Sequence, residues 1–146
     1  MLGLDDMLDA YRQVPVCVQQ QVFTYVAVFL SEHGGWHYLD LFGLPFGLSA
    51  SVTAFNRLPA LVSACARRVF ACITGAYFDD NVTLGLAEWA CWSQANLAKV
   101  FSAFGAALAS HKRFTMAPSR IFIGLVVTLA AAKEGYIVIE PKPGLR

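Results

Sequence analysis

The sequence predicts an α+β fold in which antiparallel strands form a sheet and helices cover one face of it. Apolar residues make up 57% of the 146 residues and charged residues only 14%, enough for one domain with a sizeable core. Short runs rich in β-branched and aromatic residues come in pairs, and longer helical segments lie between these pairs. Paired strands alternating with helices are typical of an α+β sheet.

The first third of the chain is expected to hold three strands and a helical turn. Residues 1–6 resemble the end of a strand, and residues 7–13 a short helical turn that Pro15 ends. Residues 22–30 are rich in β-branched and aromatic residues. After a glycine-containing turn, residues 36–42 predict the returning strand of a hairpin.

A long helix is expected next. The rigid elbow at residues 44–48 contains Pro and Gly, and Ser49 or Ser51 can cap the helix that follows it to about Arg68. Pro59 falls inside this helix. Because proline in a helix interior costs about 3 kcal/mol, we expect a kink or a restart there.

The second half begins with a polar loop between two apolar runs, residues 69–73 and 82–86, which we expect to be buried strands. Residues 87–108 are rich in alanine and contain spaced aromatic residues, which predicts an amphipathic helix. Three short strands are expected near the end of the chain, at residues 112–116, 120–127 and 135–139.

Several classes of protein are disfavoured by composition. No apolar run is long enough to span a membrane, and the acidic N-terminus is not a signal peptide. The four cysteines show no CxxC spacing, so we expect free, buried thiols in a reducing, intracellular compartment. His33 and His37 are four residues apart, but the two glycines between them favour a turn over a metal-binding helix.

The charge is uneven although the net charge is only +1. The first ninety residues are acidic overall, whereas basic residues prevail from Lys99 onward. A nucleic-acid-binding protein usually shows a larger basic excess. A basic C-terminal third beside an acidic centre would still suit a polyanion whose reacting end meets metal ions.

The loop Tyr77-Phe78-Asp79-Asp80 places two adjacent carboxylates between the predicted strands. A second acidic pair, Asp5-Asp6, lies far upstream. Carboxylates from two distant strands suggest a magnesium site, because Mg²⁺ prefers hard oxygen ligands and takes few of them from protein. The alternative interpretation is an ordinary solvated loop.

Four blocks of the sequence together resemble the palm of reverse transcriptases, in particular those of retrotransposons. Each block matches one family motif, in the family's order, and together they cover nearly the whole chain: residues 6–15, residues 44–57, the YxDD box at 77–80, and residues 112–125 with a lysine motif and a primer-grip hairpin. The resemblance implies a polymerase palm over residues 1–146, with an antiparallel sheet and helices on one face.

The resemblance implies a two-metal catalytic site. Asp6 and Asp79 would bind both Mg²⁺ ions (Mn²⁺ is also possible), Asp80 would support them, and the backbone carbonyl of Met7 would add a ligand. The spacing to the following aromatic residue selects Asp6 over Asp5, which is expected to be a solvated neighbour. Two-metal sites of this kind clamp the attacking and leaving oxygens in phosphoryl transfer.

The resemblance also implies a nucleotide site. Tyr11 would be the steric gate that excludes a ribose 2′-hydroxyl, unless it is simply a core aromatic residue. Phe46 and Gly47 would lie along the incoming nucleotide and the template base. Lys112 would stand near the triphosphate, unless it is a surface lysine.

Contacts to the template and primer are implied for four residues. Arg57 would face the template strand, with an ordinary solvated helix arginine as the alternative, and Tyr77, Phe122 and Gly124 would contact the template or the primer. The implied partners are an RNA/DNA template-primer and deoxynucleoside triphosphates, with no membrane.

The function implied is RNA-directed DNA synthesis, in which deoxynucleotides are added to a primer 3′ end. We expect the fingers to be largely missing before residue 6, and the thumb and RNase H to be absent after residue 146. The remaining polyprotein domains are therefore expected partners, and the chain alone should be weak or inactive. The alternative is a catalytically inert relic or domesticated palm that binds nucleic acid or serves a structural role.

Overall fold

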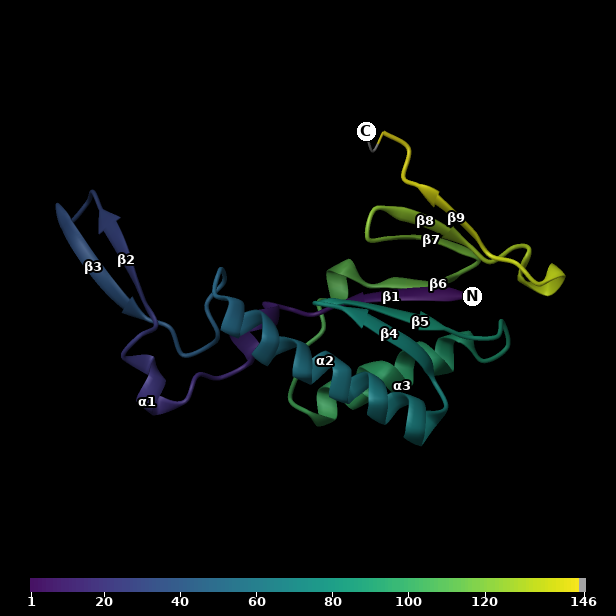
Figure 1. The fold of residues 1–146 in the computed structure, drawn as a ribbon, viewed down its shortest axis with the longest axis horizontal. Helices are drawn as coiled ribbons and strands as arrows, with labels where there is room; N and C mark the ends of the chain where they lie inside the picture. The colour runs from purple at the N-terminus through teal and green to yellow at the C-terminus, as the bar shows by residue number, and fades with distance from the viewer. Residues whose placement is uncertain (145–146) are drawn as a thin grey trace. The chain divides into compact units, whose positions relative to one another are not determined.

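The computed structural model describes residues 1–144 (Figure 1). The chain divides into two compact units. Unit 1 combines Met1–Leu8 with the chain from Leu58 onward, and unit 2 comprises Asp9–Arg57. Each unit is described by itself.

A four-stranded antiparallel sheet forms the centre of unit 1. Its strands lie in the order β4-β5-β1-β6, so that the N-terminal strand sits between two strands from the second half of the chain. This arrangement confirms the predicted antiparallel α+β fold. The strands are β1 (Leu2–Asp6), β4 (Ile73–Tyr77), β5 (Asp80–Leu84) and β6 (Phe114–Ala117).

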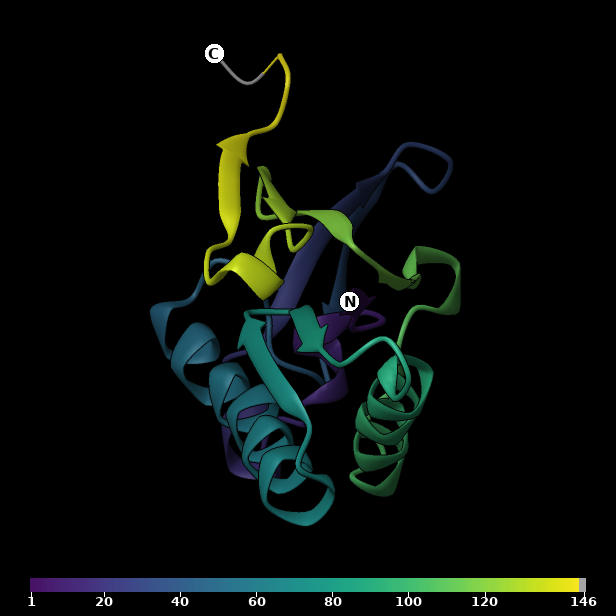
Figure 2. The same ribbon diagram turned by 90° about the vertical axis from the view of Figure 1, so that its right-hand side faces the viewer.

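Two helices lie on one face of this sheet, as predicted (Figures 1 and 2). They are α3 (Ala90–Ala103) and the part of α2 (Ser49–Phe70) that follows Leu58. Their buried side chains build the core of unit 1, because these side chains and the strands beneath them exclude water from each other. The core side chains of the two helices include Val62, Ala66, Leu97, Val100 and Phe101.

Helix α2 runs without interruption through Pro59, so the expected restart does not occur. The helix also extends to Phe70, which means that the apolar run at residues 69–73 is not the strand predicted there. Ala71 follows in the left-handed conformation, with φ of 51°, and the amide of Cys72 donates to the carbonyl of Ala66 at 3.2 Å. A left-handed residue directly after the last helical turn is a common way for a helix to end.

A second, three-stranded sheet completes unit 1, in the order β7-β8-β9. The expected single strand at residues 120–127 is instead a hairpin, because Ile123 and Gly124 both have positive φ and form a two-residue turn. The strands are β7 (Ser119–Phe122), β8 (Leu125–Thr128) and β9 (Val138–Pro141). One 3₁₀ turn, Ser110–Lys112, precedes β6, and another, Ala132–Glu134, lies between β8 and β9.

Unit 2 contains the predicted hairpin, made of β2 (Tyr25–Leu30) and β3 (Gly35–Asp40). A 3₁₀ turn at Ala10–Gln13 and a short helix α1 at Val18–Gln21, which was not expected, precede it. Large apolar side chains on both faces of the hairpin are exposed, including Tyr25, Val26, Phe29, Leu30, Trp36, Tyr38 and Leu39. A two-stranded hairpin of this kind is marginally stable by itself.

Two further findings concern the described residues. None of the helices within residues 1–144 is long and apolar enough to cross a membrane.

The cysteines carry free thiols, but only Cys72 is buried, whereas Cys17 and Cys91 are exposed. The expectation that all four thiols are buried is therefore wrong.

We predict that Gly43→Ala destabilises unit 2 by more than about 2 kcal/mol. A Cβ at Gly43 would lie 2.7 Å from the Cα of Arg12 and closer still to its carbonyl oxygen, and neither backbone atom can move freely. Gly34→Ala is the matched control, since a Cβ there meets nothing within 4 Å and costs only the left-handed backbone, about 1–2 kcal/mol. Thermal unfolding of both variants measures the difference, and equal losses would contradict the packing argument.

Candidate functional site

Two of the predicted carboxylates face each other across adjacent strands. Asp6, the last residue of β1, pairs in register with Asp80, the first residue of β5. Directly paired residues of an antiparallel ladder share one face of the sheet, with Cβ atoms about 5 Å apart. The pairing of β1 with β5 therefore brings together two carboxylates that are far apart in the sequence.

Asp79 lies beside this pair in the two-residue loop that joins β4 to β5. Its carbonyl oxygen accepts hydrogen bonds from the amide of Met7, at 3.1 Å, and from Asn81 Nδ2, at 2.9 Å. Phe78, the other loop residue, has a φ of +53°, which a bulky side chain adopts only at a cost of about 1–3 kcal/mol. The loop is thus tied to the end of β1 in a conformation that its own sequence does not favour.

The charges of the neighbouring carboxylates act on Asp80. Burial raises the pKa of Asp80, and the negative charges of Asp79 and Asp6 raise it further. Lys112 has the opposite effect and lowers this pKa. The acidic cluster therefore carries more negative charge than Lys112 neutralises.

Lys112 supplies the positive charge that the cluster does have. Its Nζ lies 3.3 Å from Asp6 Oδ1 and 3.2 Å from Asp6 Oδ2, so it contacts both oxygens of one carboxylate. The lysine side chain is 56% exposed and that of Asp6 only 16%. A solvated, flexible ammonium pairs with Asp6 at little cost and can leave it when another cation arrives.

Asp5 points to the other face of the sheet, because successive side chains of a strand alternate. It is 2% exposed, so the expectation of a solvated neighbour is wrong. Gln94 Nε2 donates to its Oδ2 at 3.0 Å, and Arg113 Nε lies 3.2 Å from its Oδ1 without forming a hydrogen bond. Burial raises the pKa of Asp5, and Gln94 and Arg113 oppose this shift.

Gln94 is a positioning residue that the sequence analysis did not single out. From α3 its side-chain nitrogen contacts the carbonyl oxygens of Leu4 at 3.3 Å and Phe114 at 3.0 Å, in addition to Asp5. One amide therefore links the helix to both β1 and β6. The signal in the sequence was a glutamine in the middle of an apolar helical segment, and the structure shows that its side chain is buried.

The backbone around Met7 is also held in place. The amide of Leu8 donates to Ala107 at 3.0 Å, and the amide of Ala109 donates to Asp6 at 2.8 Å. The carbonyl of Met7 is the predicted metal ligand. None of these three hydrogen bonds, counting the one from the Met7 amide to Asp79, uses this carbonyl.

The predicted nucleotide-binding residues other than Lys112 lie in unit 2. Tyr11 is 9% exposed and packs between Phe55 and Phe46, with ring centroids 4.6 and 4.7 Å away. This placement is that of a core aromatic residue, and the steric-gate role stays a prediction. Gly47 has a φ of +90°, so the elbow needs glycine at this position.

The predicted template and primer residues are divided between the units. Arg57 is exposed on α2 in unit 2. In unit 1, Tyr77 is half-exposed, with its ring edge-on to Phe78 at 4.8 Å. Phe122 is the last residue of β7, and Gly124 lies in the turn that follows. Their contacts with nucleic acid stay predictions.

Two cavities adjoin the face of the sheet that carries Asp6. The first, of about 240 Å³, is lined by both paired carboxylates together with His111, Lys112 and Phe122, among others. It provides room beside the acidic cluster. Within residues 1–144, however, no three Asp, Glu, His or Cys side chains converge closely enough to hold a metal ion.

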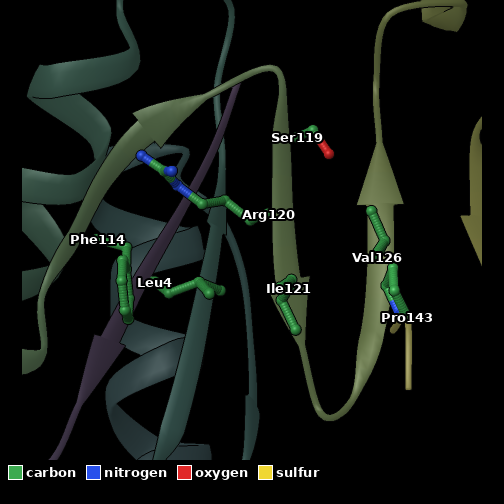
Figure 3. A pocket seen from close by; sticks show the side chains of 7 residues that line it. All are labelled: Leu4, Phe114, Ser119, Arg120, Ile121, Val126 and Pro143. Atoms are coloured by element: carbon green, nitrogen blue, oxygen red, sulfur yellow. The ribbon is translucent and has the colours of Figure 1, made fainter. Parts of the chain in front are cut away.

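The second cavity, of about 500 Å³, lies between the two sheets of unit 1. Figure 3 shows Leu4 and Phe114 on its one side and Ile121 and Val126 on the other. Its polar side chains already have partners: Ser119 is hydrogen-bonded to Thr128 at 2.9 Å, and the Arg120 guanidinium contacts the carbonyl of Thr115. The cavity is therefore apolar in character.

Replacing Asp5 with Asn tests the cost of its buried charge. Because its pKa is higher in the folded chain than in the unfolded chain, the wild-type chain loses stability as the pH rises through the raised pKa. Asp5→Asn has no titrating group there and should lose less stability between about pH 4 and pH 7. Thermal unfolding across this range measures the effect.

Asp5→Ala is the control for this experiment. It removes the acceptor of Gln94 as well as the charge, so it should cost about 1–3 kcal/mol at every pH. If wild type and Asp5→Asn lose stability in parallel as the pH rises, the burial of the Asp5 charge is not what limits stability.

Comparison with known proteins places the fold. No protein-family model matches the sequence, and no curated protein matches it. Among solved structures, the foamy viral protease-reverse transcriptase in complex with an RNA/DNA hybrid is similar, with a TM-score of 0.70 and 17% identity over 88% of this chain. The foamy viral protease-reverse transcriptase dRH in complex with double-stranded DNA has a TM-score of 0.67 and 18% identity, also over 88% of this chain.

The match covers 16% and 21% of those two viral chains, so this chain spans about a fifth of their length or less. At such low identity the likeness concerns the fold alone. The fold of this chain is therefore similar to that of part of the two viral proteins.

Proposed function

We propose that the chain is the palm of an RNA-directed DNA polymerase of the retrotransposon type, which adds deoxynucleotides to a primer 3′ end. The observation that carries this proposal is the register of β1 on β5, which sets Asp6 opposite Asp80 beside the loop that holds Asp79. Four sequence blocks in the family's order and the reverse-transcriptase-like fold support it.

The donor set of the site fits Mg²⁺ or Mn²⁺. Asp6, Asp79 and Asp80, with the carbonyl of Met7, offer the hard oxygen atoms that these ions prefer. The raised pKa of Asp80 supports a cation there, since its causes include the charges of the other two carboxylates. When bound, the ions would neutralise charge on the attacking and leaving oxygens of phosphoryl transfer.

Lys112 is proposed as the partner of the triphosphate. It contacts Asp6 in the described structure and is more than half exposed, so its flexible side chain is free to turn toward a phosphate nearby. Tyr11, Phe46 and Gly47 are proposed to contact the incoming nucleotide. Arg57, Tyr77, Phe122 and Gly124 are proposed to contact the template-primer.

The proposed nucleic-acid partners agree with what the similar proteins bind. One viral structure holds an RNA/DNA hybrid and the other double-stranded DNA. The present chain would meet only part of such a duplex, because it spans about a fifth of those proteins or less. We therefore propose that further domains, namely fingers, thumb and RNase H, complete the binding surface.

The isolated chain should be a weak polymerase. A triphosphate needs several cations, and electrostatic stabilisation is usually the largest part of such catalysis. Near the acidic cluster the described residues supply Lys112, whereas Arg113 is already paired with buried Asp5. From residue 13 to residue 56 the sequence contains neither lysine nor arginine.

A catalytically inert palm is the second candidate function, and two observations favour it. Asp6 is already neutralised by Lys112, and no metal-holding group of three side chains is present within residues 1–144. A domain of this kind would bind nucleic acid or serve a structural role without turnover.

Primer extension on an RNA template, with Mg²⁺ and deoxynucleotides, tests the activity. We expect slow but measurable extension by the wild-type chain and background levels for Asp79→Asn. Asp5→Asn is the matched control, because this neighbouring carboxylate lies on the opposite face and should leave extension unchanged. Equal extension by wild type and Asp79→Asn would contradict the proposed active site.

Metal titration separates the two candidate functions. By calorimetry, Mn²⁺ should bind the wild-type chain and lose about tenfold or more in affinity in Asp6→Asn and Asp79→Asn. Lys112→Ala should bind more tightly than wild type, because its ammonium no longer competes for Asp6. An inert palm would show no difference among these four chains.

A further inference from the structure

Two histidines meet at the tip of the β2–β3 hairpin in unit 2. His37 lies on β3 opposite Val28, and His33 lies in the turn, where its amide donates to the carbonyl of Leu30 at 3.1 Å. The two ring centroids are 5.6 Å apart, with the ring planes inclined by 61°. Both side chains are exposed. The hairpin therefore presents two imidazoles side by side to solvent.

The separation of the rings suits two ligands of one ion. Zinc–nitrogen bonds are about 2.0–2.1 Å long and the geometry is tetrahedral, so two imidazoles on one zinc have ring centroids about 5 Å apart. The observed 5.6 Å needs only a small side-chain adjustment to reach this value. The turn itself is held by a second hydrogen bond, from the amide of Gly34 to the carbonyl of Ser31 at 3.3 Å.

The charge of the surrounding chain favours a cation over an anion. Between residues 13 and 56 the formally charged side chains are Glu32 and Asp40, both acidic. Glu32 is the immediate neighbour of His33, and Asp40 lies on the same strand as His37. No lysine or arginine in this stretch of sequence would repel a bound metal ion.

We propose that His33 and His37 form a binding site for a divalent transition-metal cation that prefers imidazole nitrogen, such as Zn²⁺ or Ni²⁺. The two imidazoles supply two ligands, and water completes the coordination shell. Mg²⁺ does not compete, because it prefers oxygen ligands. The site belongs to unit 2 and shares no residue with the carboxylate cluster of unit 1.

The bound ion would act on the stability of the hairpin. A two-stranded ribbon with both faces exposed is marginal by itself, and an ion that joins its turn to β3 binds the folded form selectively. Such an ion stabilises the folded hairpin by mass action, in proportion to the logarithm of its concentration over its dissociation constant.

Zinc titration of the full chain tests the proposal. The titration uses a Cys17→Ser, Cys91→Ser background, because these two exposed thiols would otherwise bind the metal. With Mg²⁺ present in excess to occupy the proposed carboxylate site of unit 1, calorimetry should show one zinc site, with shifts of the His33 and His37 ring resonances in NMR spectra. His33→Ala and His37→Ala should each lose about tenfold or more in affinity. An excess of Mg²⁺ should leave zinc binding unchanged.

Two controls make the result specific. His111→Ala removes the histidine of unit 1 and should bind zinc as the background chain does. Exchanging neighbours, with Trp36→His and His37→Trp in one chain, keeps the composition but moves the imidazole to the opposite face of the hairpin. This exchange should abolish the site while the circular dichroism spectrum stays unchanged. The proposal is overturned if zinc does not bind, if the exchanged chain binds as well, or if His111→Ala causes the loss.

Discussion

The pairing of β1 with β5 is the constraint on which the candidate site depends. A slip of one residue in this register would turn Asp6 to the helix-covered face, because strand side chains alternate. Two features of β1 oppose such a slip. Gly3 faces α3, where a Cβ would lie 2.9 Å from Gln94 Cδ, and Asp5 is bound by the same glutamine. The helix-covered face therefore accommodates glycine at residue 3 and a short hydrogen-bond acceptor at residue 5, and Asp6 lies on the opposite face.

The hydrogen bonds of Gln94 on the helix-covered face of the sheet thus help to position the carboxylates on the opposite face. Burying the carboxylate of Asp5 is unfavourable, as the direction of its pKa shift shows. The same interaction network has a favourable effect, because Gln94 joins α3 to β1 and β6. The end of β1 is thereby held in the position where Asp6 pairs with Asp80. The strained backbone at Phe78 belongs to the same arrangement, since it sets Asp79 against the amide of Met7.

The two units differ in how their charges are placed. In unit 1 the acidic residues lie at the ends of neighbouring strands, and their repulsion is relieved in part by Lys112. Unit 2 is almost without charge along its hairpin, and its exposed surface is aromatic and aliphatic, with two adjacent histidines at the turn. A cation in unit 1 would meet oxygen ligands, whereas a cation at the hairpin would meet nitrogen ligands, so the two positions favour different metals.

Much of the local structure could be predicted from the sequence, because its causes are local. The β-branched and aromatic pattern of the hairpin, the long helix after the Pro-Gly elbow, and the acidic loop between strands all depend on neighbouring residues. Two predictions of element bounds were wrong. Residues 69–70 continue α2 rather than begin a strand, and residues 120–127 fold back at two residues of positive φ.

The sequence by itself determined the types of the main elements, the antiparallel α+β class and the identity of the acidic residues. Only the tertiary structure decided which of two adjacent aspartates faces the cluster, which cation pairs with it, and that two histidines across a glycine turn lie side by side. The physical reason is that propensity acts over a few residues, whereas the direction of a side chain depends on strand register and on packing against segments far along the chain.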